Sequence, residues 1–81
     1  MAIDLDGPDY LREQVAAVLR ERIARGEYPP NRRIPPETDL TAEFNVSRPT
    51  VRAALAILEE EGLILTRRGK GRYVTAREER D

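Results

Sequence analysis

Apolar residues recur at helical spacing near the beginning of the chain. Five of them fall on one side of a helical wheel: Leu11, Val15, Val18, Leu19 and Ile23. This spacing predicts an amphipathic helix from Pro8 to Ile23. Asp9 suits its N-cap, and Gly26 suits the position just after its end. Arg22 falls within the apolar arc, so we expect its stem to pack against the core and its charged end to reach solvent.

A proline-rich connector and a short second helix come next. The four prolines of "EYPPNRRIPP" exclude a regular helix and leave room for a short strand at Arg32 to Ile34. Pro36 or Glu37 then begins a helix that ends at Phe44. Leu40 and Phe44 are one turn apart, so both are expected to face the core.

The third helix follows the tight connection "FNVS". Ser47 suits its N-cap, and Gly62 suits its end, so the sequence predicts a helix from Arg48 to about Glu61. Pro49 is tolerated in the first turn. The apolar residues of this helix share one arc that should face the core: Val51, Ala54, Leu55 and Leu58. Two helices joined by about three residues form a helix-turn-helix.

A β-hairpin is predicted after the third helix. The run "LILTRRGKGRYVT" places two β-rich segments around a Gly-Lys-Gly turn, and the charged tail "AREERD" follows. This order of elements is typical of a mainly α winged helix-turn-helix, in which three helices precede a small hairpin, the wing. We expect an N-terminal arm at residues 1–8, the winged helix-turn-helix at residues 9–75, and a tail or the start of a linker at residues 76–81.

The composition excludes several classes of function. Eighty-one residues are enough for one small domain. The chain has no cysteine and no histidine, which removes disulfides, thiolate metal sites and the most common general base. No cofactor motif is present, so we expect no enzyme, no metal and no cofactor. Because the apolar runs are short, we also expect no membrane span and a cytoplasmic protein.

The charges are unevenly distributed along the chain. The 14 basic and 15 acidic residues nearly cancel, and the acidic block at Glu59 to Glu61 is expected to face solvent. From Arg67 to Arg77, however, there are five basic residues and no acidic one. Such a local patch can bind phosphate whatever the net charge, because salt confines the influence of each charge to roughly 8 Å.

Two arginines lie on the free side of the third helix. Arg48 and Arg52 are one turn apart there, with Thr50 at the edge of the exposed face. The planar guanidinium of arginine can contact guanine O6 and N7 together or hold a phosphate, and the major groove admits a helix. The pattern therefore favours a recognition helix. The alternative is that both arginines are surface charges paired with Glu43 or nearby acids.

The hairpin tip forms a second candidate site. Gly69 and Gly71 on either side of Lys70 permit positive φ angles and remove side chains that would hold the backbone away from a ligand. We expect these three residues to reach the minor groove or the phosphates, supported by Arg68 and Arg72. The alternative is a solvated turn. A phosphate-binding P-loop is excluded because its glycine and lysine spacing is absent.

These motifs carry a resemblance to a known family. The segment from about Tyr10 to Val74 resembles the DNA-binding domain of the GntR family of bacterial transcription regulators. The match rests on "VSRPTVRAAL", "L-x-x-EGL" and "GKG-x-YV" in this order and spacing, and the forms "PPE" and "EEEGL...GKG" are similar to the HutC-like branch. The resemblance implies a repressor that binds specific double-stranded DNA, with helix 48–61 in the major groove and wing 67–72 on the minor groove or phosphates.

The resemblance also implies particular contacts. The residues that match DNA-contacting positions of the family are Ser47, Arg48, Pro49, Thr50 and Arg52. Relatives often have Pro-Ser-Glu at the start of the second helix, followed by arginine. Here Pro36 replaces the capping serine and Thr38 replaces the arginine. We therefore expect the second helix to lack a side-chain cap, and Thr38 to be a weaker phosphate contact.

Assembly is a further implication of the resemblance. Members of the family generally carry a C-terminal domain that binds an effector and dimerises. The full-length protein is thus expected to be a homodimer on a palindromic operator, and the isolated domain to be a monomer. The alternative function is a winged-helix module for protein–protein interaction, which would use the exposed face around Ala53 and Ala56 as a groove for its partner.

Overall fold

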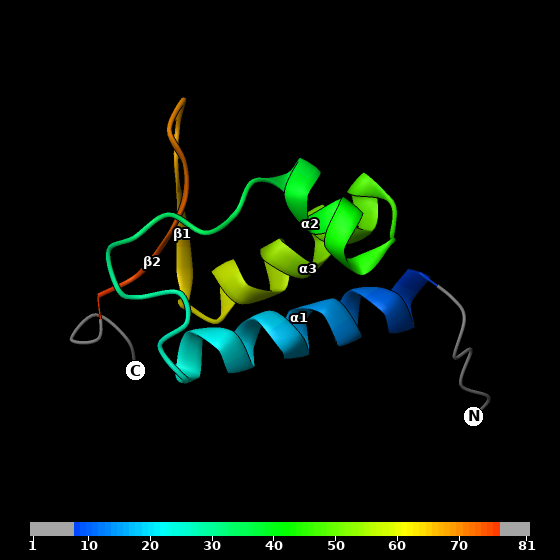
Figure 1. The fold of residues 1–81 in the computed structure, drawn as a ribbon, viewed down its shortest axis with the longest axis horizontal. Coiled ribbons are helices and arrows are strands. Elements are labelled where there is room, and N and C mark those ends of the chain that lie inside the picture. The colour runs from blue at the N-terminus through cyan, green and yellow to red at the C-terminus, as the bar shows by residue number, and fades with distance from the viewer. Residues whose placement is uncertain (1–7, 77–81) are drawn as a thin grey trace.

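The structure, a computed structural model, describes residues 8–76. Three helices, α1 (Pro8–Ala24), α2 (Glu37–Phe44) and α3 (Arg48–Glu60), precede an antiparallel hairpin of β1 (Ile64–Arg67) and β2 (Gly71–Val74). In Figure 1, α3 lies between α1 and α2, and the hairpin projects away from the helices. The architecture is the mainly α winged helix-turn-helix that the sequence predicts.

The predicted outer boundaries fall at the edge of what the structure describes. Most of the predicted arm and tail, residues 1–7 and 77–81, lie outside the described residues. Pro8 begins α1, as the apolar spacing predicted, although it was also counted in the arm; Asp9 therefore lies within the first turn and is not the N-cap. Ala76, expected in the tail, is buried. The described fold thus includes one residue on each side of the expected boundaries.

The helical faces form a single core. The four apolar residues of α3 predicted to face inward are all buried, as is Leu40 of α2, while Phe44 packs against the core from its edge. In α1 the buried stripe runs along Val15, Leu19 and Ile23, as expected, but Val18 is 39% exposed and Ala16 is buried instead. The prediction for Val18 was wrong because α1 packs along a narrow stripe that includes position 16, and position 18 falls beyond its edge.

The connector between α1 and α2 pairs with the wing. The Asn31 and Ile34 N–H groups donate to the carbonyls of Val74 and Arg72 at 2.8 and 2.9 Å, and the Val74 N–H donates to Arg32 at 2.9 Å. The strand expected at Arg32 to Ile34 is thus present as a single bridge, Arg33 to Tyr73. It stays short because the flanking prolines have no N–H to donate.

Local sequence signals define the helix-turn-helix. The Ser47 hydroxyl accepts a hydrogen bond from the Thr50 N–H at 3.3 Å, which confirms it as the N-cap of α3. Pro36 caps α2 with its backbone conformation and makes no side-chain cap bond, also as expected. Between the two helices Asn45 adopts a left-handed conformation, with φ of 53°. α3 ends at Glu60, one residue earlier than expected, and Glu61 is its C-cap.

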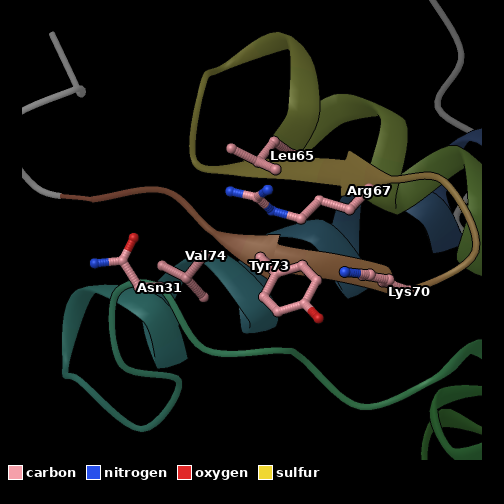
Figure 2. Close-up of a pocket in the computed structure, with 6 residues that line it drawn as sticks. All are labelled: Asn31, Leu65, Arg67, Lys70, Tyr73 and Val74. Atoms are coloured by element: carbon pink, nitrogen blue, oxygen red, sulfur yellow. The ribbon is translucent and has the colours of Figure 1, made fainter.

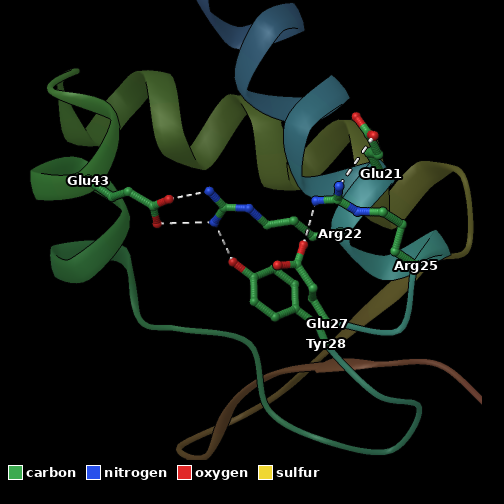
Figure 3. A network of polar contacts seen from close by, with 6 residues as sticks. All are labelled: Glu21, Arg22, Arg25, Glu27, Tyr28 and Glu43. Atoms are coloured by element: carbon green, nitrogen blue, oxygen red, sulfur yellow. Dashed lines mark hydrogen bonds and ion pairs between the residues drawn. The ribbon is translucent and has the colours of Figure 1, made fainter.

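Arg22 joins α1 to α2. Its guanidinium donates to the Glu43 carboxylate and, at 2.7 Å, to the Tyr28 hydroxyl (Figure 3), and it lies 5.3 Å from the centre of the Phe44 ring. As expected, the stem packs inward while the charged end stays partly exposed, with the side chain 21% exposed; a carboxylate and two aromatic rings lie beside it. The hydrogen bond to Glu43 is the main reason that the pKa of Arg22 is raised, and the bond to Tyr28 adds to it. The Arg22 guanidinium in turn lowers the pKa of Glu43. The network fixes the first half of the helix-turn-helix against α1.

The acidic block at the end of α3 is exposed, and Glu59 and Glu61 within it are paired. Arg20 of α1 binds the two carboxylate oxygens of Glu61 at 2.7 and 2.8 Å, and Glu59 accepts a hydrogen bond from Thr66 of β1. These residues face solvent, as expected, and they also connect the end of α3 to α1 and to the wing.

Candidate nucleic-acid interface

The first turns of α3 present most of the predicted contacts to solvent. Ser47, Arg48 and Pro49 are exposed, and so is Arg52, one turn later. The Arg48 and Arg52 side chains are 50% and 58% exposed. Because the N-terminal end of a helix carries partial positive charge, these guanidinium groups and the helix terminus attract the same anions.

Thr50 departs from the predicted arrangement. The sequence placed it at the edge of the exposed face, but it is only 7% exposed. Its hydroxyl lies 3.0 Å from the Ser47 hydroxyl, and its N–H donates to the same oxygen. The buried arc of α3 is therefore wider on this side than the helical wheel suggested. Thr50 thus supports the cap of α3, and only the margin of its side chain reaches the surface.

The wing tip has the conformation that its glycines predict. Arg68, Gly69, Lys70 and Gly71 are exposed, and the Lys70 N–H donates to the Arg67 carbonyl at 2.9 Å to close the turn. Gly69 and Gly71 have φ angles of 76° and 111°, which other residues rarely adopt. A side chain at Gly71 would also meet Arg33, whose Cδ would lie 3.4 Å from the new Cβ.

The outer face of the wing is a cationic surface around Tyr73. The guanidinium groups of Arg33 and Arg67 lie 5.7 and 5.6 Å from the centre of its ring. Arg67 and Lys70 also line the hollow of about 290 Å³ shown in Figure 2. Arg33 donates to the Tyr73 hydroxyl at 3.3 Å and thereby lowers the pKa of that hydroxyl. The sequence reasoning did not assign Arg33 or Tyr73 to the site.

The inner face of the wing carries Arg72. Side chains alternate along a strand, so Arg72 and Tyr73 point to opposite faces of the hairpin. Arg72 points toward α2, where its Nη1 lies 3.0 Å from a carboxylate oxygen of Glu37. Arg72 is therefore held against the helices, whereas Lys70 is at the tip.

Glu37 brings the helix and the wing together. Arg52 donates from Nε to both of its carboxylate oxygens, at 3.0 and 3.1 Å, and Arg48 Nε lies 3.7 Å away. Burial raises the pKa of Glu37, but the hydrogen bonds from Arg52 and Arg72 outweigh that effect, so its pKa lies below the usual value. Arg48 and Arg52 thus do pair with an acid, as the alternative interpretation supposed, and that acid is Glu37 and not Glu43.

A groove opens beside Glu37 between the helices and the wing. This hollow of about 280 Å³ is lined by Arg33, Arg48, Arg72, Pro36, Thr38 and Gly71, among others. Thr38 is exposed there, close to the start of α2. The structure therefore brings Thr38 together with basic residues of α3 and β2, while Arg68 and Lys70 form a separate group at the wing tip.

Other kinds of site find no support within residues 8–76. In that range no three acidic side chains gather into a group that could hold a metal ion. No helix of the described part of the chain is both long and apolar enough to cross a membrane.

Comparison with known proteins identifies the family. Residues 11–74 match the model of the bacterial regulatory proteins, gntR family. The chain belongs to the GntR family. It is 47% identical over 64 residues to the mannosyl-D-glycerate transport/metabolism system repressor MngR of Escherichia coli, covering 79% of this chain and 27% of MngR. It is 42% identical over 62 residues to the Uxu operon transcriptional regulator of the same organism, covering 76% and 24%.

Solved structures of GntR proteins have the same winged helix-turn-helix. The DNA-binding domain of AraR, in complex with operator ORR3, is 34% identical and superposes with a TM-score of 0.77 over 80% of this chain and 78% of AraR. Streptococcus agalactiae GntR is 31% identical, with a TM-score of 0.73 over 84% of this chain and 33% of that one. The chain spans about a quarter of the length of the regulators MngR and Uxu. Its place in the HutC-like branch stays a prediction.

Proposed function

We propose that this GntR chain binds double-stranded DNA in a sequence-specific manner as part of a bacterial transcription regulator. The observation that carries the proposal is the arrangement of its arginines: Arg48 and Arg52 on the exposed face of α3 and Arg72 on the wing converge beside one groove. The operator complex of the similar AraR domain supports it.

In this proposal α3 enters the major groove. Arg52 reads a base edge, because its guanidinium is exposed and can pair with guanine O6 and N7. Arg48, Ser47 and Pro49 lie at the N-terminal end of α3 and contact the adjacent phosphates, where the helix terminus adds attraction for anions. Thr38, at the start of α2, contributes a further phosphate contact. The buried Thr50 acts mainly through Ser47.

The wing contacts the DNA beside the recognition helix. The tip, Gly69 to Gly71, brings the backbone and the Lys70 ammonium close to the minor groove or its phosphates, and Arg68 adds charge. Arg72 stays at the base of the wing. A protein-binding module remains the alternative, but exposed arginines at two separate sites favour a polyanion over a protein groove.

The whole protein is proposed to be a homodimeric repressor in the cytoplasm. Its relatives are about three times as long as this chain, which leaves room for a C-terminal effector domain that dimerises. MngR is named a repressor, which supports that direction of regulation. Two such chains would bind a palindromic operator, since the symmetry of the dimer is repeated in the site.

Selection of bound duplexes from a random pool tests the proposal. The chain is immobilised, the pool is incubated in competition with unrelated DNA, and the retained duplexes are sequenced over several rounds. We expect one motif to be enriched, with two related half-sites. A pool that stays random after repeated selection would contradict sequence-specific binding.

A further inference from the structure

Glu37 occupies the point where α2, α3 and the wing meet. Its carboxylate is contacted by Arg52 and Arg48 from α3 and by Arg72 from β2. The side chain of Glu37 is only 17% exposed, so its charge is less screened by water than that of a surface acid. One half-buried acid thus faces three arginines that the proposed function assigns to the DNA interface.

The contacts with α3 use only part of each guanidinium. Arg52 bonds to Glu37 through Nε, and the nearest approach of Arg48 is also through Nε. The two terminal Nη groups of Arg52, which can donate in parallel to O6 and N7 of guanine, are not taken up by these bonds. A side chain held in this way loses less freedom on binding than one that is free to rotate.

The same carboxylate reduces the positive charge of the interface. Three arginines without Glu37 would present three full charges to any phosphate, and phosphate attraction is the main source of non-specific binding. With Glu37 present, the net charge of the four side chains is +2. Attraction to DNA of any sequence is therefore weaker, while the directional bonds that orient Arg52 are retained.

We infer that Glu37 is a positioning residue for sequence recognition, which orients Arg52 for base contact and weakens binding to unrelated DNA. The inference rests on the proposed DNA-binding function. It predicts that the loss of Glu37 lowers the affinity for the specific DNA site and raises the affinity for unrelated DNA. A residue that only braced the fold would lower both of them together.

The test compares Glu37→Gln and Glu37→Asp with the unaltered chain. Affinities for a selected duplex and for a scrambled duplex of the same composition are measured by fluorescence anisotropy over a series of KCl concentrations. Circular dichroism first confirms that each variant is folded. Glu27→Gln is the matched control, because it removes the same charge from the pair with Arg25 beyond the end of α1.

Each variant has a distinct expected result. Glu37→Gln should bind the scrambled duplex several-fold more tightly, with a salt slope steeper by at most about 0.9. Its preference for the selected duplex should fall about ten-fold, as expected for one weakened base contact. Glu37→Asp keeps the charge but is one methylene shorter, so its preference should fall while its scrambled-duplex affinity and salt slope stay unchanged. Glu27→Gln should keep the full preference.

Three results would overturn the inference. An equal loss of both affinities in the Glu37 variants would make Glu37 a structural brace. An undiminished preference in both variants would show that it does not orient Arg52. The same changes in Glu27→Gln would assign the effect to net charge alone. If instead the unaltered chain prefers no duplex, the proposed function itself fails, which separates that outcome from the other three.

Discussion

Arg52 on α3 donates from Nε to both carboxylate oxygens of Glu37, at 3.0 and 3.1 Å, although the two residues are fifteen positions apart. This bond ties the first turn of α2 to the exposed face of α3. It holds Arg52, to which we assign base reading, in a defined position. Variants of Glu37 therefore test the orientation of Arg52, and variants of Arg52 test its contact with DNA.

Replacement of Arg52 by alanine should weaken specific binding by about 1–3 kcal/mol, because one bidentate base contact is lost. Preference should relax at one base position in each half-site. The measurement is anisotropy against the selected duplex and its single-base variants. Arg25→Ala, which removes the same charge at the end of α1, is the control and should preserve the preference. Unchanged base preference in Arg52→Ala would remove α3 as the recognition helix.

Lys70→Ala should act on all DNA alike. The Lys70 ammonium at the wing tip is expected to meet a phosphate and not a base, so affinity for the selected and the scrambled duplex should fall by similar factors. The slope of log K against log salt should decrease by about 0.9, the value for one phosphate contact. An intact slope would mean that the wing tip is a solvated turn.

Ser47→Ala should destabilise the fold by about 1 kcal/mol, because α3 loses its side-chain cap. The buried Thr50 hydroxyl also loses the oxygen that lies 3.0 Å away. Urea unfolding followed by circular dichroism measures the change. Thr38→Ala, at an exposed position of α2, is the control and should change stability little. Equal stability of the Ser47→Ala variant and the unaltered chain would contradict the capping role.

Stability should fall in acid. Arginine partners keep the pKa values of Glu37, Glu43 and Glu61 below their usual range in the folded state. A carboxyl with a lowered folded pKa stabilises the fold above its unfolded pKa, about 4.3, and this stabilisation is lost as the pH falls through the folded pKa. The urea midpoint should therefore be steady above pH 5 and decrease below about pH 4.3.

Glu43→Gln identifies one contributor to that acid effect. At neutral pH it should cost up to about 1 kcal/mol, since the Arg22 pair is partly exposed. Its urea midpoint should also depend less on pH below about 4.3. A variant as sensitive to acid as the unaltered chain would show that the Arg22–Glu43 pair does not contribute.

The chain should be a monomer in the absence of DNA. Among the described residues, Val18 is the one large apolar side chain that is exposed, which is too little for a stable dimer interface. A full palindrome should nevertheless recruit two copies, one on each half-site. Analytical ultracentrifugation with and without duplex measures both. A tight dimer without DNA would contradict this prediction, and the α1 face around Val18 would be the first candidate for its interface.

The fold was predictable because its signals are local. The apolar arc of α3, the Ser47 cap and the turn before it can each be read from a few neighbouring residues, and together they define the helix-turn-helix. The exposed positions of Arg48 and Arg52 follow from the same arc. Thr50 was misplaced because a helical wheel gives the direction of a side chain but not the width of the surface that covers it.

The contacts that organise the site could not be read from the sequence. Glu37 meets Arg72 only after the wing has folded back beside α2, and Arg33 reaches Tyr73 only because the connector pairs with β2. Arg22 likewise finds Glu43 across two helices. Nothing in the spacing of these residues specifies their partners, since each pair depends on how separate elements pack.

Methylation interference on the selected duplex tests the central claim most directly, because a methyl group on guanine N7 blocks the major-groove edge that an arginine reads. Duplexes carrying sparse N7 methylation are incubated with the unaltered chain and with Arg52→Ala, and bound and free fractions are compared. We expect each half-site to contain at least one guanine whose methylation excludes binding by the unaltered chain, and this sensitivity to disappear in Arg52→Ala. Identical interference patterns for the two proteins would contradict base reading by Arg52 from α3.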